Sequence, residues 1–121
     1  MGLYTGIALD NVTINSGRIK ATNFSTTAPV IKTADFTVAA TENNLICNGT
    51  GAITVTLPAA SSWTGRELTI KTIAAQAVSS AATNVKPITS DTAGTAILAG
   101  TDGEWAKLVS DGTNWVVMAA G

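Results

Sequence analysis

Hydrophobic and polar residues alternate with a period of two along much of the chain from residue 35 onward. The clearest run is residues 53–57, where Ile53, Val55 and Leu57 share one face and two threonines share the other. This alternation is typical of a half-buried β-strand. By the same pattern we predict strands at residues 35–38, 44–48, 66–71, 85–88 and 95–98.

The end of the chain predicts a β-hairpin. Two strand-like runs flank the step from Asp111 to Gly112, and glycine adopts the positive φ of a tight turn without a steric penalty. The second run, residues 115–118, reads Trp-Val-Val-Met and has no polar side. Since neither face of this strand suits water, we expect one face to meet the core and the other a second subunit.

Short strands separated by turn signals about every ten residues predict an all-β domain. The spacing favours a small antiparallel β-sandwich or a barrel-like head. Residues 75–83 interrupt the pattern with small residues and hydroxyl side chains, and we predict a loop or a poor strand there.

The first 33 residues differ from the rest of the chain. Their apolar pieces are short and are separated by Gly, Asn and Thr, so none can build a sheet with its neighbour in sequence. We therefore predict an extended N-terminal arm at residues 1–33 and a β-rich head at residues 34–121. The arm should gain order by packing on its own domain or on a partner.

The composition and the distribution of charge restrict the partners that this protein can have. Only 12% of the 121 residues are charged, whereas about a quarter is usual, which indicates that much of the surface is covered. The net charge is −1 and the seven basic residues are scattered between Arg18 and Lys107, so we expect no nucleic-acid partner. Residues 1–4 have no basic flank and begin no long apolar run. We therefore expect no signal peptide, no membrane partner and synthesis in a cytoplasm.

The chain contains few groups that could carry out catalysis. It has no histidine, which excludes Ser-His-Asp and Cys-His catalysis and histidine-based zinc sites. Asp102 and Glu104 could face the same way as a carboxylate pair, and Asp111 with Asn114 is a similar candidate. Turn and solubilising roles are the more frequent ones for such residues. Cys47 follows Leu-Ile and is predicted to be a core residue. We expect no catalytic residue, no cofactor and no metal site.

The three tryptophans, Trp63, Trp105 and Trp115, have two possible roles. Aromatic rings can stack on sugars, and Trp63 is the best candidate because it lies in a predicted loop. Tryptophan also packs in cores and anchors subunit interfaces, which is the more frequent use.

Four motifs occur in order in the predicted head. They are Leu-Pro-Ala-Ala at 57–60, Gly-Arg-Glu-Leu-Thr-Ile-Lys at 65–71, Asn-Val-Lys-Pro-Ile at 84–88 and Leu-Val-Ser-Asp-Gly-Thr-Asn-Trp at 108–115. This ordered set resembles a β-domain of bacteriophage fibre, head-fibre and capsid-decoration proteins. The resemblance implies a homotrimer whose head is held to the virion by an N-terminal segment. Unlike longer fibres, this chain has no shaft repeat.

The resemblance and the apolar last strand together predict a non-enzymatic capsid decoration (head-fibre) trimer. It would be made in the bacterial host cytoplasm and lie on the capsid exterior, bound to the major capsid protein or another virion component. The predicted attachment residues are Leu3, Tyr4, Ile7 and Leu9, and the predicted trimer interface residues are Trp105, Trp115, Val116, Val117 and Met118. The alternative is the receptor-binding tip of a tail fibre, with Trp63 contacting a host surface glycan.

Overall fold

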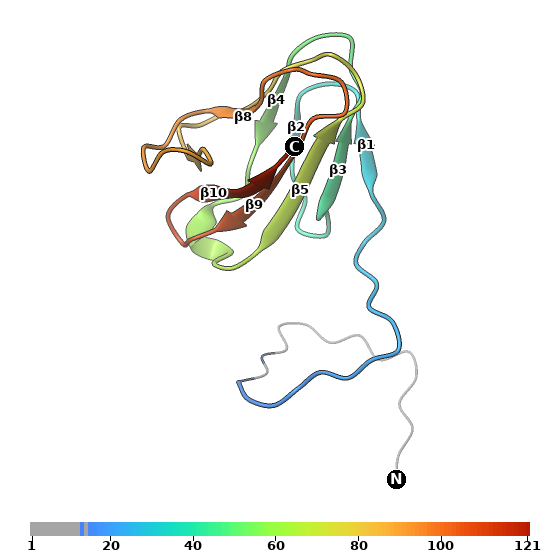
Figure 1. The fold of residues 1–121 in the computed structure, drawn as a ribbon, viewed down its shortest axis with the longest axis vertical. Helices are drawn as coiled ribbons and strands as arrows, with labels where there is room; N and C mark the ends of the chain where they lie inside the picture. The colour runs from blue at the N-terminus through green and yellow to red at the C-terminus, as the bar shows by residue number, and fades with distance from the viewer. Residues whose placement is uncertain (1–12, 14) are drawn as a thin grey trace.

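The computed structural model describes residue 13 and residues 15–121. The head contains a six-stranded sheet in the order β1-β3-β5-β9-β10-β7 and a four-stranded sheet in the order β2-β4-β6-β8 (Figure 1). The strands are β1 (Val30–Lys32), β2 (Phe36–Thr37), β3 (Asn44–Cys47), β4 (Ile53–Thr56), β5 (Glu67–Thr72), β6 (Val78–Ser80), β7 (Val85–Lys86), β8 (Ala96–Leu98), β9 (Trp105–Ser110) and β10 (Trp115–Ala120). One 3₁₀-helix, η1 (Ala60–Ser62), follows β4.

The first six strands wind between the two sheets. β1, β3 and β5 lie in the larger sheet, and β2, β4 and β6 lie in the smaller one. Each strand pairs in parallel with the strand two places along the chain. The segment is therefore a short β-solenoid in which each successive pair of strands forms one coil.

The remaining strands close one end of this solenoid. β9 pairs antiparallel with β5 and β10, and β8 pairs antiparallel with β6. β7 adds to the edge of β10 in parallel. The prediction of an all-β, sandwich-like head is confirmed, but its antiparallel pairing is wrong for five of the eight strand pairs. Alternation reports which face of a strand is buried and carries no information on the direction of the neighbouring strand.

The terminal hairpin forms as predicted. β9 and β10 pair on either side of residues 111–114, and Gly112 has a φ of 92°. One strand was not predicted, and a second confirms one of two alternatives. β1 lies inside the predicted arm because Val30 pairs with Leu45 of β3, so the head begins at Val30. β6 lies in the stretch predicted as a loop or poor strand, where Val78 is fully buried.

The core lies between the two sheets. Its fully or almost fully buried members include Leu45, Cys47, Ile53, Val55, Leu68, Ile70, Val78, Val85, Leu108 and Trp115. The predicted core position of Cys47 is confirmed, and burial raises the pKa of its thiol to about 11. Among the described residues no helix has the length and apolarity needed to span a membrane.

The described part of the N-terminal segment, residues 15–29, is exposed and contains no strand or helix. It leads away from the head at β1 (Figure 1). Near the head, the side-chain amides of Asn43 and Asn44 donate to the hydroxyls of Thr27 and Thr26, both at 3.4 Å. The predicted attachment residues Leu3, Tyr4, Ile7 and Leu9 lie outside the described residues.

Candidate functional site

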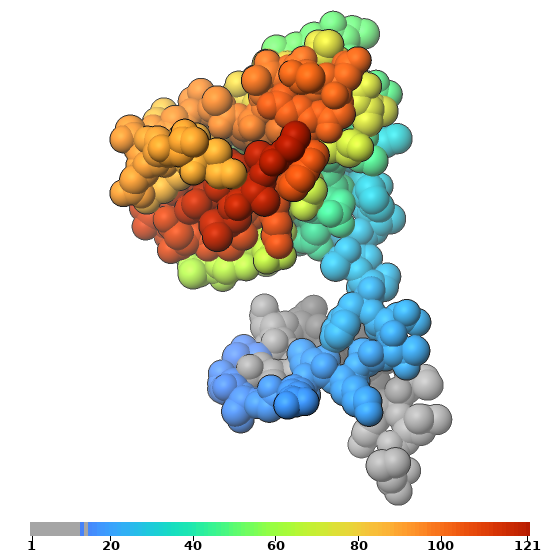
Figure 2. All heavy atoms as spheres, viewed as in Figure 1, coloured from blue at the N-terminus to red at the C-terminus, as the bar shows by residue number. Residues whose placement is uncertain are grey.

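The outer face of the six-stranded sheet is not covered by another part of the described chain. Figure 2 shows β3, β5, β9 and β10 at the surface with no segment of the chain over them. Several apolar side chains alternate with core residues and so project outward from this sheet: Ile31, Ile46, Trp105, Val109, Val116 and Met118. Ile31 and Met118 are 60% and 61% exposed. Charged side chains also project from this face, Glu67 and Lys71 from β5 and Lys107 from β9. The outer face is therefore a mixture of apolar and charged side chains.

The predicted interface residues are divided between two environments. Trp115 and Val117 are 0% and 7% exposed and belong to the core of the head. Their assignment to a trimer interface is therefore corrected, because alternate side chains of a strand point to opposite faces. Trp105, Val116 and Met118 lie on the outer face. This sorts the apolar run of residues 115–118 into an inward and an outward pair.

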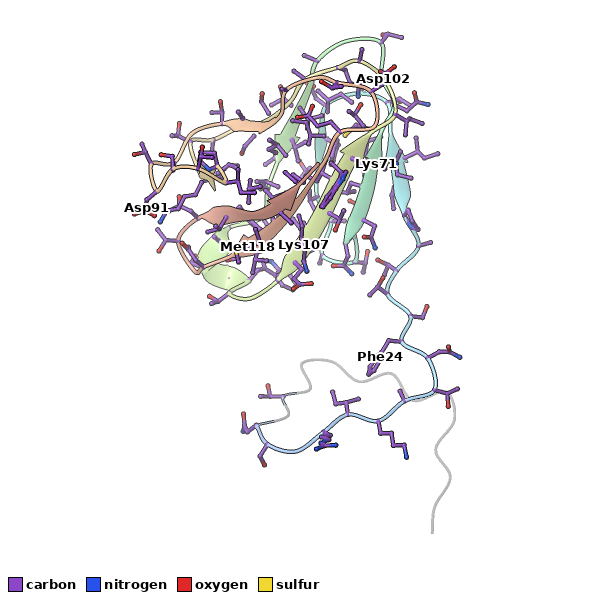
Figure 3. All side chains as sticks on the ribbon, viewed as in Figure 1. Phe24, Lys71, Asp91, Asp102, Lys107 and Met118 are labelled. Carbon is purple, nitrogen blue, oxygen red and sulfur yellow. The ribbon has the colours of Figure 1, made fainter. Side chains whose placement is uncertain are left out.

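A hollow of about 550 Å³ lies where β10 meets the loop that follows β7. Its apolar side chains include Ile88, Val116 and Met118, and its carboxylates are Asp91 and Asp111. Figure 3 labels Met118 on the sheet and Asp91 at the projecting loop. The hollow therefore combines an apolar surface with acidic groups at its edge.

Lys86 partly neutralises this hollow. Its Nζ lies 2.8 Å from Oδ1 of Asp91 and 3.7 Å from Oδ2 of Asp111, and the hydrogen bond to Asp91 is the main cause of the raised pKa of Lys86. Two carboxylates face one ammonium group here, so the hollow keeps a net negative charge. Ile88 and Asp91 were not singled out from the sequence, because they lie in a predicted strand and a predicted turn without a distinctive motif.

Glu104 is hydrogen-bonded through its carboxylate to the backbone of the loop between β8 and β9. Its carboxylate accepts the N–H groups of Ala99, Gly100 and Thr101 at 2.9, 2.8 and 3.1 Å. These hydrogen bonds, that from Ala99 first, hold the pKa of Glu104 below its ordinary value. The carboxylate thereby fixes the connection between β8 and β9. This geometry supports the structural interpretation of the Asp102 and Glu104 pair.

Asp111 has a similar role in the terminal hairpin. Its Oδ1 accepts the N–H groups of Asn114 and Thr113 at 2.7 and 2.8 Å, and these bonds lower the pKa of the carboxyl group. Asp111 and Asn114 are therefore joined by a turn. Within the described part of the chain, no group of three or more Cys, Asp or Glu side chains is placed to hold a metal ion.

Trp63, the predicted glycan contact, is 38% exposed and follows η1. The guanidinium of Arg66 lies 4.4 Å from the centre of its ring. Arg66 also donates through Nη2 to the carbonyl oxygens of Ala39 and Glu42 at 2.9 and 2.6 Å. One face of the indole is thus covered, and a surface hollow of about 650 Å³ lined by residues 62–66 lies beside it.

Comparison with known proteins finds no match to a family model, to a curated protein or to a solved structure.

Proposed function

We propose that this chain is a non-enzymatic structural protein of a bacteriophage virion, a trimeric capsid decoration (head-fibre) protein. Its N-terminal arm holds it on the capsid exterior. The observation that carries this proposal is the exposed segment of residues 15–29, in which Phe24 and Ile19 are 75% and 60% exposed. Apolar side chains on an extended segment without a core of its own favour association with a partner.

The trimer is supported by the outer face of the six-stranded sheet. Trp105, Val116 and Met118 gather there, and only 12% of the chain is charged. A closed ring of three copies buries equivalent surfaces on every subunit and leaves none unmatched. We expect a solution mass of three times the 12.2 kDa of one chain. A monomer would contradict the trimer.

Electron microscopy of labelled particles tests the location. We expect label over the facets of the capsid head, and label only at the tail end would contradict decoration. Deleting residues 2–15 should abolish binding to particles that lack the protein, since this removes Leu3, Tyr4, Ile7 and Leu9. The Ile73→Ser variant, which changes a 49% exposed side chain of the head, is the control and should bind normally. Undiminished binding after the deletion would refute attachment through the arm.

The second candidate function is the receptor-binding tip of a tail fibre, which recognises a host surface glycan. The observation that favours it is the partly exposed indole of Trp63 beside a surface hollow. Under this candidate, Trp63→Ala abolishes binding to host-cell glycans and Ile73→Ser, at a 49% exposed side chain of the head, does not. Equal binding by both variants and the unchanged protein would exclude it.

A further inference from the structure

The described part of the arm carries two basic and two large apolar side chains among small and uncharged polar residues. Arg18 and Lys20 are its only charged residues, and the nearest acidic residues in the sequence are Asp10 and Asp35. Within the described residues, neither Arg18 nor Lys20 makes an ion pair. Ile19 and Phe24 are the large apolar side chains of this segment, and both are mostly exposed. The arm therefore has the chemistry of a ligand for an apolar surface with acidic groups.

The hollow beside β10 has the complementary chemistry. Ile88 and Met118 are 59% and 61% exposed at its apolar side. The Asp91 side chain is 97% exposed, and Lys86 is shared between Asp91 and Asp111. Two carboxylates share one ammonium group here, so an arriving cation would meet their net negative charge and could share the exposed Asp91 carboxylate with Lys86.

Phe24 of the same chain falls short of this hollow. Thr26 contacts Asn44 of β3, and Phe24, two residues earlier, can extend at most about 7 Å further. The hollow lies at β10 and β7, three to four strands away from β3 in the sheet order, or roughly 14 to 19 Å. Figure 3 shows Phe24 well below the head and away from Met118. In a neighbouring copy, residues 18–24 reach the hollow when the start of β3 of that copy lies beside it, since residues 18–26 span up to about 30 Å.

We infer that residues 18–24 of one copy bind in the hollow of a second copy. Phe24 packs against Ile88 and Met118, and Lys20 pairs with Asp91. The inference rests on the proposed trimer and deepens it, because each copy gives one arm and receives another, and such head-to-tail contacts close into a ring. The predicted attachment residues Leu3, Tyr4, Ile7 and Leu9 precede this segment in the sequence.

Two positive charges favour a protein surface over the other usual partners of basic segments. Lipid-binding basic clusters contain about four to eight Lys or Arg residues. Proteins that bind DNA tightly through its backbone make about six to ten phosphate contacts. An apolar anchor such as Phe24 flanked by few charges is instead typical of a protein interface, where aromatic residues including Phe are enriched.

Photocrosslinking tests the contact directly. Benzoylphenylalanine is placed at position 24 of the full chain, and unlabelled and ¹⁵N-labelled protein are mixed before illumination. We expect covalent dimers of mixed label, with the crosslink mapped by mass spectrometry to peptides that contain Ile88 or Met118. The same probe at Ile73 is the control and should give at least tenfold fewer dimers. Crosslinks only within a chain, equal yields from both positions or no crosslinks would overturn the inference.

Substitutions in the hollow provide the second test. Ile88→Ser and Asp91→Lys should each raise the dissociation constant of the oligomer at least tenfold in sedimentation, whereas Ile73→Ser and Asp102→Lys should not. The double variant Lys20→Asp with Asp91→Lys should regain most of the loss caused by Asp91→Lys.

The outcomes separate this inference from the proposed function. We call the binding of residues 18–24 in the hollow of a second copy arm exchange. If the dissociation constant of the trimer is unchanged by both Ile88→Ser and Asp91→Lys, arm exchange is wrong and the decoration proposal still stands. Failure of an intact trimer of the unchanged chain to bind particles that lack the protein would overturn the decoration proposal alone.

Discussion

Trp115 connects the last strand to the opposite side of the core. It is fully buried, and its indole Nε1–H donates to the carbonyl oxygen of Pro58 at 2.9 Å. Pro58 follows β4 in the other sheet. The ring thus fills space between the sheets while its one polar group is satisfied, as buried tryptophans require.

Trp115→Phe should lower the free energy of unfolding by about 2 to 3 kcal/mol, because it leaves the Pro58 carbonyl without this donor and creates a small void. Trp105→Phe, at a surface tryptophan, should change it by less than about 0.5 kcal/mol. Guanidinium titration of both variants measures the difference. Equal losses would contradict the distinct roles of the two residues.

Glu104 provides a pH-dependent contribution to stability. Its pKa in the folded chain lies below the ordinary 4.5 because three backbone N–H groups donate to the ionised form. The resulting stabilisation is present above pH 4.5 and is lost as the pH falls from there through the lower folded-state pKa.

Glu104→Gln should therefore cost about 1 kcal/mol at neutral pH, a modest value because solvent screens this carboxylate. The difference from the unchanged protein should shrink as the pH falls below 4.5. Urea titrations between neutral and acidic pH measure it. Glu67→Gln, which removes only an exposed ion pair with Lys107 at 3.3 Å, is the control. A difference that grew on acidification would refute the assignment.

At the scale of elements, the solenoid depends on close stacking of the turns that follow β1, β3 and β5. The backbone N–H of Gly49, after β3, donates to Oε1 of Gln76 at 2.7 Å. A Cβ at Gly49 would lie 2.8 Å from the carbonyl oxygen of Thr33 and 3.1 Å from Oε1 of Gln76. The middle turn therefore has no room for a side chain between its two neighbours.

Gly49→Ala should lower the free energy of unfolding by about 1 to 3 kcal/mol, because the backbone at Thr33 must move. Gly51→Ala, in the same turn with open space around it, should have no effect or stabilise slightly. Thermal and urea unfolding measure both variants. If the two substitutions have the same effect, close stacking at Gly49 is not needed.

At the scale of the whole molecule, the strands in the middle of the larger sheet are long and paired on both sides, whereas the strands at the sheet edges are short. β5 and β9 have neighbours on both sides and six residues each. The edge strands β1, β2, β7 and β8 have two or three residues. Such short edges also discourage uncontrolled strand addition.

Amide hydrogen exchange should therefore be slowest in β5 and β9 and faster in all four edge strands. If residues 18–24 bind in the hollow of a second copy, amide protection of both segments depends on association and therefore on protein concentration. Protection of residues 18–24 and 87–91 should rise with protein concentration, while that of β5 remains constant. Uniform protection at every concentration would contradict this distribution.

The local strands, the terminal hairpin and part of the core could be predicted from the sequence. The alternation at residues 53–57 and the Asp-Gly step at residues 111–112 predicted β4 and the terminal hairpin, and Leu-Ile-Cys predicted the burial of Cys47. These features depend on residues that are adjacent in the chain. Local backbone preferences and the side-chain period of a strand are sufficient to determine them.

The tertiary structure decided the rest. The parallel winding, the inclusion of Val30 in the sheet and the three amide partners of Glu104 all depend on where distant segments meet. The same is true of the apolar run at residues 115–118, whose inward members fill the core and whose outward members Val116 and Met118 line the hollow. A run without polar residues carries no period that assigns its faces. Only packing against the opposite sheet, which buries Trp115 and its N–H, makes that assignment.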